Sequence, residues 1–151
     1  MDRNAILNAF MTSYSTFSAS DSRETIEKVL KYSGDASDMI RRADVKREAA
    51  VFRIQSATTD YLTSDDKPND LEQAWDVMVF VEQGDSHSIK EARYNRLFEI
   101  TDQLMDWSIN VSPASINVDV YTITLTGATP TVELEGYIST TLSFNSILKL
   151  Q

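Results

Sequence analysis

The sequence predicts an α+β fold: an antiparallel or mixed sheet of four or more strands, a helix packed across it, and helices at the N-terminus. Three observations support this class. Residues 88–107 repeat apolar side chains at three- and four-residue spacing, as an amphipathic helix does. Residues 50–62 and 72–82 alternate apolar and polar side chains, and so does the tail from Val132. A hairpin, a crossing helix and a second hairpin are typical of α+β domains.

The chain has 151 residues, which is the usual size of one domain. We therefore expect a single domain over 1–151, with a helical part at 1–48 and a hairpin–helix–hairpin part at 49–151. The chain has no cysteine and one histidine, His87, which argues against disulfides, thiolate metal sites and multi-histidine centres. We expect no cofactor and no metal. No apolar run approaches the ~20 residues that span a bilayer, so we expect no membrane partner.

The N-terminal part is predicted to be helical. Apolar residues at helical spacing indicate a first helix over 2–14. Asp21 and Glu24 stand three residues apart, as in a capping box, and predict a second helix over 21–32. A short amphipathic helix is expected within 35–48.

The two alternating segments, 50–62 and 72–82, are predicted to pair as a long antiparallel hairpin. The residues between them, 63–70, are rich in Asp, Asn, Ser and Pro, which all favour turn geometry. We therefore expect a loop at 63–70 that forms an acidic hairpin tip.

A helix is predicted over 88–107, beginning at a capping box formed by Ser88 and Glu91. Its apolar stripe is broad, as in a helix that packs across a sheet. The stripe contains Ile89, Leu97, Ile100, Leu104 and Trp107, widened by Tyr94, Phe98 and Met105.

The last part of the chain is the richest in β-branched residues. We expect one strand over 116–126, a turn at Gly127–Pro130, and a second strand from Val132 almost to the end. Alternation along that second strand predicts one buried face, and Gly136 is interpreted as a bulge within it.

The charge balance is acidic, with a net charge of −9. Residues 49–107 carry five basic and twelve acidic side chains, whereas 1–48 carry eight of each sign. Tight nucleic-acid binding needs basic groups that neutralise phosphates. The chain is therefore a poor candidate for a DNA or RNA reader.

Catalytic groups are scarce, and the chain is not expected to be an enzyme. His87 has no nucleophile motif beside it and is interpreted as a surface residue. Glu133 and Glu135 share one predicted strand face, and Asp119 lies on the neighbouring strand. Paired carboxylates can serve glycoside hydrolysis, but this alternation is more typical of a solvated strand face.

Two charged clusters are candidate interaction surfaces. The hairpin tip should project from the domain, because burying several carboxylates is costly. A basic cluster within the short amphipathic segment at 35–48 could contact an acidic partner. The candidate residues are Asp65, Asp66, Lys67 and Asp70 at the tip, and Arg41 and Arg42 in the basic cluster.

Two stretches of the sequence resemble phage tail terminator and tail-completion proteins. They are DVMVFVEQGDSHSIKEARYNRLFEITDQLMDW at 76–107 and VYTITLTGATPTVELEGYISTTLSF at 120–144. The recurring feature is a strand, a short polar turn, and then a helix with Ala92, Arg96 and apolar residues at regular spacing. The resemblance covers about 50–150 and rests on element order and spacing.

This resemblance implies a virion protein without catalytic activity, assembled in the host cytoplasm. Copies of the chain would form a homo-oligomeric ring, a hexamer, at the head-proximal end of the tail tube. The ring would end tube polymerisation and contact the tail tube protein, the head–tail connector protein and, in contractile tails, the sheath. DNA would pass through its lumen without specific binding. Two alternatives stay open: a head–tail adaptor or stopper, and, more remotely, a small soluble enzyme with a carboxylate site.

Overall fold

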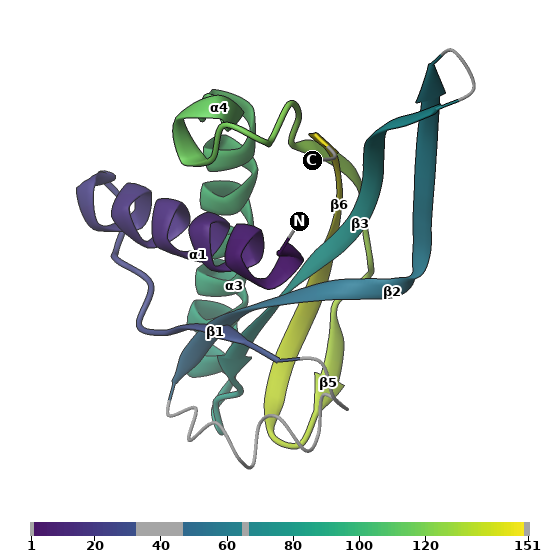
Figure 1. The fold of residues 1–151 in the computed structure, drawn as a ribbon. Helices are drawn as coiled ribbons and strands as arrows, with labels where there is room; N and C mark the ends of the chain where they lie inside the picture. Colours follow the sequence, from purple (N-terminus) through teal and green to yellow (C-terminus); the bar gives the residue numbers. More distant parts are fainter. Residues whose placement is uncertain (1, 33–46, 65–66, 150–151) are drawn as a thin grey trace.

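Figure 1 shows the protein as a computed structural model, which describes residues 2–32, 47–64 and 67–149. Its helices are α1 (Arg3–Ser20), α3 (His87–Asn110) and the short α4 (Pro113–Ile116). Its strands are β1 (Val29–Lys31), β2 (Glu48–Ser64), β3 (Lys67–Glu82), β4 (Thr124–Ala128), β5 (Val132–Leu134) and β6 (Tyr137–Lys149). The predicted α+β class is confirmed. Among the described helices, none has the length and apolar character needed to cross a membrane.

The six strands form one mixed sheet. Its order is β1-β2-β3-β6-β4, and β5 also pairs with β6. β1 runs parallel to β2, whereas all the other neighbouring strands are antiparallel. At the centre, Trp75 lies opposite Phe144 and Val77 lies opposite Leu142. The N-terminal and C-terminal parts of the chain therefore meet through β3 and β6.

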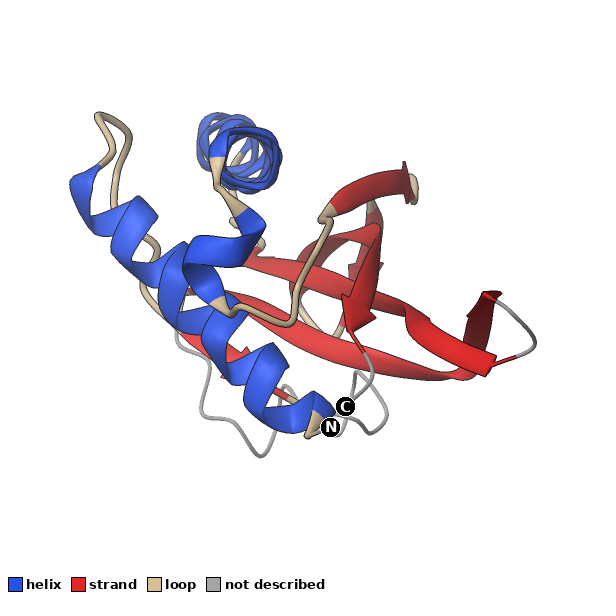
Figure 2. Ribbon diagram, turned by 45° about the horizontal axis from the view of Figure 1, so that its top comes forward, coloured by secondary structure: helices blue, strands red, loops and turns tan. Residues whose placement is uncertain are grey.

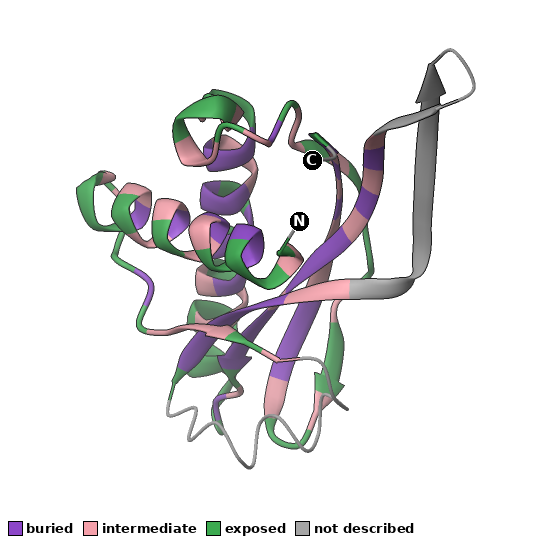
Figure 3. Ribbon diagram, viewed as in Figure 1, coloured by how far each residue is buried: buried purple, intermediate pink, exposed green. Residues whose placement is uncertain are grey.

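Both long helices cover the same face of the sheet (Figure 2). That face carries the main core, seen as the continuous buried segments in Figure 3. Its centre is aromatic: the rings of Trp75 and Phe144 stack with their centroids 4.5 Å apart, and Trp107 of α3 meets Trp75 edge-on at 6.3 Å. Aromatic pairs add stabilisation beyond the area they bury, so these contacts fix α3 over β3 and β6.

The first helix extends six residues past its predicted end, from 14 to Ser20. The added residues are rich in serine and threonine. The hydroxyls of Thr12, Thr16 and Ser20 donate to the carbonyls four residues earlier, at 3.1, 3.0 and 3.2 Å. Hydroxyls satisfied in this way do not compete with the helix. Burial of Tyr14 and Ser18 against α3 then holds the segment helical.

The predicted second helix at 21–32 is wrong, because this segment is extended and ends in β1. Asp21 does not cap a helix. Its carboxylate accepts hydrogen bonds from Arg23 Nε at 2.6 Å and from Gln103 Nε2 at 3.1 Å. Val29 then pairs with Ala50 on β2. The short helix expected within 35–48 lies almost entirely outside the described residues.

The predicted hairpin is confirmed as β2 and β3, with Val51 opposite Met78. The expected loop at 63–70 is much shorter, because β2 runs to Ser64 and β3 begins at Lys67. Pairing of β3 with β6 begins only at Asp70, so no described third strand needs the N–H that Pro68 lacks. A break in register between Ile54 and Thr59 bends the hairpin.

The outer part of this hairpin projects from the body of the domain (Figure 1). We call Thr59–Ser64 together with Lys67–Asp70 the arm. Along the arm, β2 and β3 pair with each other from Thr59 opposite Gln73 to Ser64 opposite Lys67. Within the described residues, no third strand joins the arm before Asp70 pairs with Lys149.

The predicted helix at 88–107 is confirmed and extends over His87–Asn110. The capping residue is Ser86 rather than Ser88, since the Ser86 hydroxyl accepts from the backbone N–H of Ile89 at 3.4 Å. The predicted stripe is buried at Leu97, Ile100, Leu104 and Trp107. Two of its predicted members are exposed instead, Ile89 by 44% and Phe98 by 50%.

The predicted strand at 116–126 is wrong over most of its length. Pro113 begins the single-turn helix α4, and the N–H of Asn117 closes that turn on the Pro113 carbonyl at 3.2 Å. The chain then touches β6 through one bridge, Val120 opposite Leu148, before β4 begins at Thr124. Proline at the first helical position starts a turn readily, which here outweighs the β-branched composition.

The predicted bulge at Gly136 is a hairpin turn. Glu135 and Gly136 both have positive φ, 52° and 82°, and Leu134 pairs with Tyr137 across them. Positive φ at both central residues is the signature of the tight turn that matches strand twist. The long final strand is therefore divided into β5 and β6. The alternation predicted along it is confirmed within β6, where Ile138, Leu142, Phe144 and Leu148 are buried.

Candidate assembly surfaces

The predicted site residues fall into two groups. Asp65 and Asp66, with Arg41 and Arg42, lie outside the described residues. Lys67 is the first residue of β3 and pairs with Ser64 across the arm. Asp70 stands where the arm joins the sheet, half-buried, between Leu62 on β2 and Lys149 on β6.

The arm is a two-stranded structure with an acidic sequence. Between Thr59 and Asp70 the chain carries four aspartates and one lysine. A hairpin of two strands is marginally stable in water unless a third strand or another surface packs against it. In the part of the chain that the structure describes, no further strand pairs along the outer edges of the arm, and the sequence around it is acidic, which suits it to contact another molecule.

At the other end of β3, a cluster of charges centres on Arg96 of α3. The guanidinium binds both carboxylate oxygens of Glu48, with Nε–Oε1 at 2.9 Å and Nη2–Oε2 at 2.6 Å. It also contacts Glu99 on the same helix and donates to the carbonyls of Glu24 and Thr25. Burial alone would lower the pKa of Arg96, but its bonds to Glu48 and Glu99 outweigh burial and raise it.

A surface hollow of about 370 Å³ lies over this cluster. We call it the arginine hollow. It is lined by Glu24, Arg47, Glu48, Ser88, Ile89, Ala92, Arg93 and Arg96. Arg96 forms ion pairs with Glu48, Glu99 and Glu24, whereas Arg93 forms none with any described residue. The hollow thus combines three guanidinium groups and two carboxylates with the exposed apolar side chains of Ile89 and Ala92.

The side chains considered for catalysis do not converge. His87 is 90% exposed at the start of α3, and its Nε2 lies 3.6 Å from Glu91. Glu133 accepts a hydrogen bond from Gln83 at 2.8 Å beside Ile138, at one end of β6. Asp119 lies beside Lys149 at the other end, and Glu135 is in the turn. The carboxylate pair that an enzyme would need is therefore not formed by Glu133 and Asp119.

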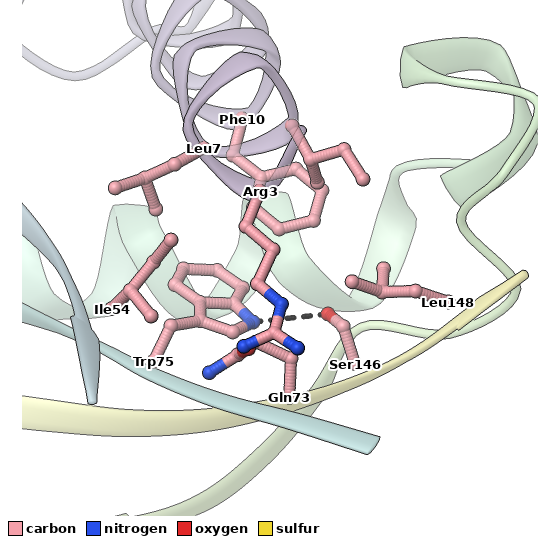
Figure 4. Close-up of a pocket in the computed structure, with 9 residues that line it drawn as sticks. Arg3, Leu7, Phe10, Ile54, Gln73, Trp75, Ser146 and Leu148 are labelled. Atoms are coloured by element: carbon pink, nitrogen blue, oxygen red, sulfur yellow. Dashed lines mark hydrogen bonds between the residues drawn. The ribbon is translucent and has the colours of Figure 1, made fainter. Parts of the chain in front are cut away.

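Within the described part of the chain, no three His, Asp or Glu side chains are grouped so that they could hold a metal ion. Figure 4 shows a small cavity between α1 and the sheet, lined by residues such as Phe10, Ile54 and Trp75. Trp75 Nε1 donates to Ser146 Oγ at 2.9 Å at its edge. Its volume of about 10 Å³ is roughly the space of one water molecule.

Comparisons with known proteins give no family. No protein-family model matches the chain, and no curated protein matches it. Among solved structures, the chain is similar to one that is 12% identical, with a TM-score of 0.49 over all of this chain and 98% of the other. Similarity at that level carries no argument about function.

The sequence pattern did not predict the arginine hollow. Its members come from the connection after α1, the start of β2 and the first turns of α3. The sequence did carry one signal, because Arg93 and Arg96 lie one helical turn apart and share a side of α3. Glu24 and Glu48 could be placed beside them only once the segment at 21–32 was known to be extended.

Proposed function

We propose that this chain is a structural protein of a tailed bacteriophage that forms a ring at the head-proximal end of the tail tube. The ring ends tube polymerisation and joins the tail to the head connector. Its partners are further copies of the chain, the tail tube protein and the connector protein, with the sheath added in contractile tails. DNA passes through the lumen without specific binding.

The observation that carries this proposal is the arm. A projecting two-stranded hairpin gains stability from a neighbour, and a chain that assembles with itself supplies that neighbour in every copy. The outer edge of β4 adds support, because no described strand pairs with it and Thr124–Ala128 carries no charge that would block pairing.

The element order gives independent support. The resemblance to tail terminators was based on a hairpin, a helix across the sheet and a second hairpin. The fold has β2–β3, α3 and β5–β6 in that order, although the second hairpin turns at Glu135–Gly136 rather than at Gly127–Pro130. The acidic balance suits a lumen through which DNA slides, because a net negative wall does not retain phosphates.

The first test is the assembly state of the purified chain. Native mass spectrometry over a wide range of concentrations should give a closed ring, and electron microscopy should show a central hole. A protein that stays monomeric at every concentration, alone and with tail tube protein, would contradict the proposal.

A second test separates a terminator from an adaptor or stopper. Tail tube protein from the same genome is polymerised with and without this chain and examined by electron microscopy. A terminator shortens the tubes and binds at one end of each tube. If tube length is unchanged and the chain binds only the connector protein, the adaptor alternative is correct.

A further inference from the structure

Residues 21–32, which we call the strap, connect α1 to the sheet in an extended conformation and include β1 (Figure 1). The sequence over 3–32 contains neither glycine nor proline, so it lacks the residues that usually end a helix. At Asp21 the backbone leaves α1 with φ −75° and ψ 159°. That φ is close to the helical value, so the helix ends there through ψ. The end of α1 is therefore set by contacts outside the helix.

The sequence of the strap favours a helix. Glu24 lies four residues before Lys28, and Glu27 lies four residues before Lys31. In a helix both pairs would be stabilising, because glutamate before lysine at this spacing is the favourable order. The apolar residues of the strap also repeat at helical spacing: Ile26, Val29 and Leu30. A helix that continues α1 is therefore a competing conformation for the strap.

Between α1 and β1, the extended strap is held mainly by side chains of other elements. Arg96 of α3 donates to the carbonyl oxygens of Glu24 and Thr25, at 3.2 and 3.4 Å. The N–H of Ile26 donates to Ser18 Oγ of α1 at 2.9 Å. Among the side chains of the strap, only that of Ile26 is buried. A few hydrogen bonds and one buried side chain thus oppose the helical alternative.

The two ends of the strap are held by similarly small contacts. Near its start, Arg23 Nη2 lies 2.8 Å from Asp106 Oδ2 of α3, and both side chains are partly exposed. Near its end, β1 pairs with β2 over three residues, and the N–H of Ala50 donates to the Lys28 carbonyl oxygen at 2.9 Å. Segments with so few buried contacts open at a lower free energy than the whole domain.

We infer that the strap is a switch with two conformations: an extended one, in which β1 covers the edge of β2, and a helical one that continues α1. Opening frees the backbone groups of Ala50 and Phe52 that the strap now binds. Freed groups at a sheet edge can pair with a strand of another chain. The strap therefore controls access to this edge of β2. The inference does not depend on the proposed function, because both conformations belong to the chain on its own.

Hydrogen exchange of the Ala50 amide measures the opening, because that N–H is bonded to the strap. Ser22→Ala and Ser22→Gly are the decisive pair, since Ser22 is exposed and alanine favours a helix more than glycine does. If the open strap is helical, Ala50 should exchange about four- to fivefold faster in Ser22→Ala than in Ser22→Gly. Amides in the central pairing of β3 with β6 report global unfolding and should exchange more slowly than Ala50.

A second pair of variants tests the contacts that hold the strap extended. Asp106→Asn weakens the ion pair with Arg23, so the Ala50 amide should exchange about twofold faster. Asp102→Asn is the matched control, an exposed change of the same kind one turn earlier on α3. It should leave the exchange rate unchanged, because Asp102 forms no ion pair with any described residue.

NMR saturation-transfer measurements on the wild-type chain identify the open conformation directly, and its Cα shifts over 22–30 should be helical. Equal or faster exchange of Ala50 in Ser22→Gly would overturn the inference, because glycine favours plain local unfolding. Random-coil shifts in the open conformation would overturn it for the same reason. Exchange of Ala50 at the rate of the β3–β6 amides would show that the strap does not open by itself. None of these results bears on whether the chain forms a ring.

Discussion

Arg53 and Asp76 form a bidentate ion pair on the face of the sheet that the helices do not cover. Arg53 Nε lies 2.7 Å from Asp76 Oδ1, and Nη2 lies 2.8 Å from Oδ2. The side chain of Asp76 is only 2% exposed, whereas that of Arg53 is 28% exposed. The arginine thus covers and neutralises a carboxylate on this face.

Arg53→Met should destabilise the fold by about 2–4 kcal/mol, because it removes both hydrogen bonds and leaves a buried charge poorly compensated. Urea unfolding measures the loss. The double variant Arg53→Met/Asp76→Asn should recover part of it, since no charge then remains buried. A loss below about 0.5 kcal/mol, the usual surface value, would show that the pair contributes little.

Leu97→Ala and Ile100→Ala should each destabilise the domain by about 2–5 kcal/mol, as large-to-small changes do at buried positions. Both side chains belong to α3 and are fully buried. Phe98→Ala is the matched control on the same helix, and its 50% exposure predicts a much smaller effect. Equal losses in thermal unfolding for Phe98→Ala and Leu97→Ala would contradict the packing of α3.

Gly84→Ala should destabilise the domain by about 1–3 kcal/mol through overpacking. A Cβ at Gly84 would lie 2.0 Å from Ile89 Cγ2 and 3.0 Å from the backbone carbon of Ile89. Gly127→Ala is the control, because a Cβ there meets nothing within 4 Å. Combining Gly84→Ala with Ile89→Ala should recover part of the stability. Chemical denaturation of these three variants and the wild type decides whether α3 packs this closely against the turn.

Protonation of Asp21 should lower the stability of the fold as the pH falls. Hydrogen bonds from Arg23 and then Gln103 lower the pKa of this carboxyl from 3.8 to about 2. A carboxyl whose folded pKa is depressed stabilises the fold above its unfolded pKa and loses that contribution as the pH falls. Thermal unfolding should therefore separate wild type from Asp21→Asn above pH 3.8, and the difference should shrink between pH 3.8 and 2. A difference that does not change over this range would contradict the assignment.

The local pattern of the sequence was enough to predict the elements with strong periodicity. The alternation through Trp75, Val77 and Val79 and the helical stripe through Leu97 and Leu104 were confirmed, because each sets one face against the core whatever the neighbours are. The acidic charge of the hairpin tip could also be read directly.

The wrong predictions concern segments whose conformation depends on distant residues. Residues 21–32 had a plausible helix cap, but the Asp21 carboxylate binds Gln103 on α3, far along the sequence. Val29 then pairs with Ala50. No local signal encodes such long-range bonds, and tertiary contacts of this strength override propensity.

The sequence alone therefore determined the α+β class, the core faces and the acidic hairpin, since these depend on composition and spacing along single elements. The tertiary structure alone decided the arginine hollow, in which Glu48 of β2 neutralises Arg96 of α3 while Arg93 keeps no described carboxylate partner. Which charges are paired depends on distances of a few ångströms between elements, because the energy of an ion pair falls steeply with separation and exposure to water.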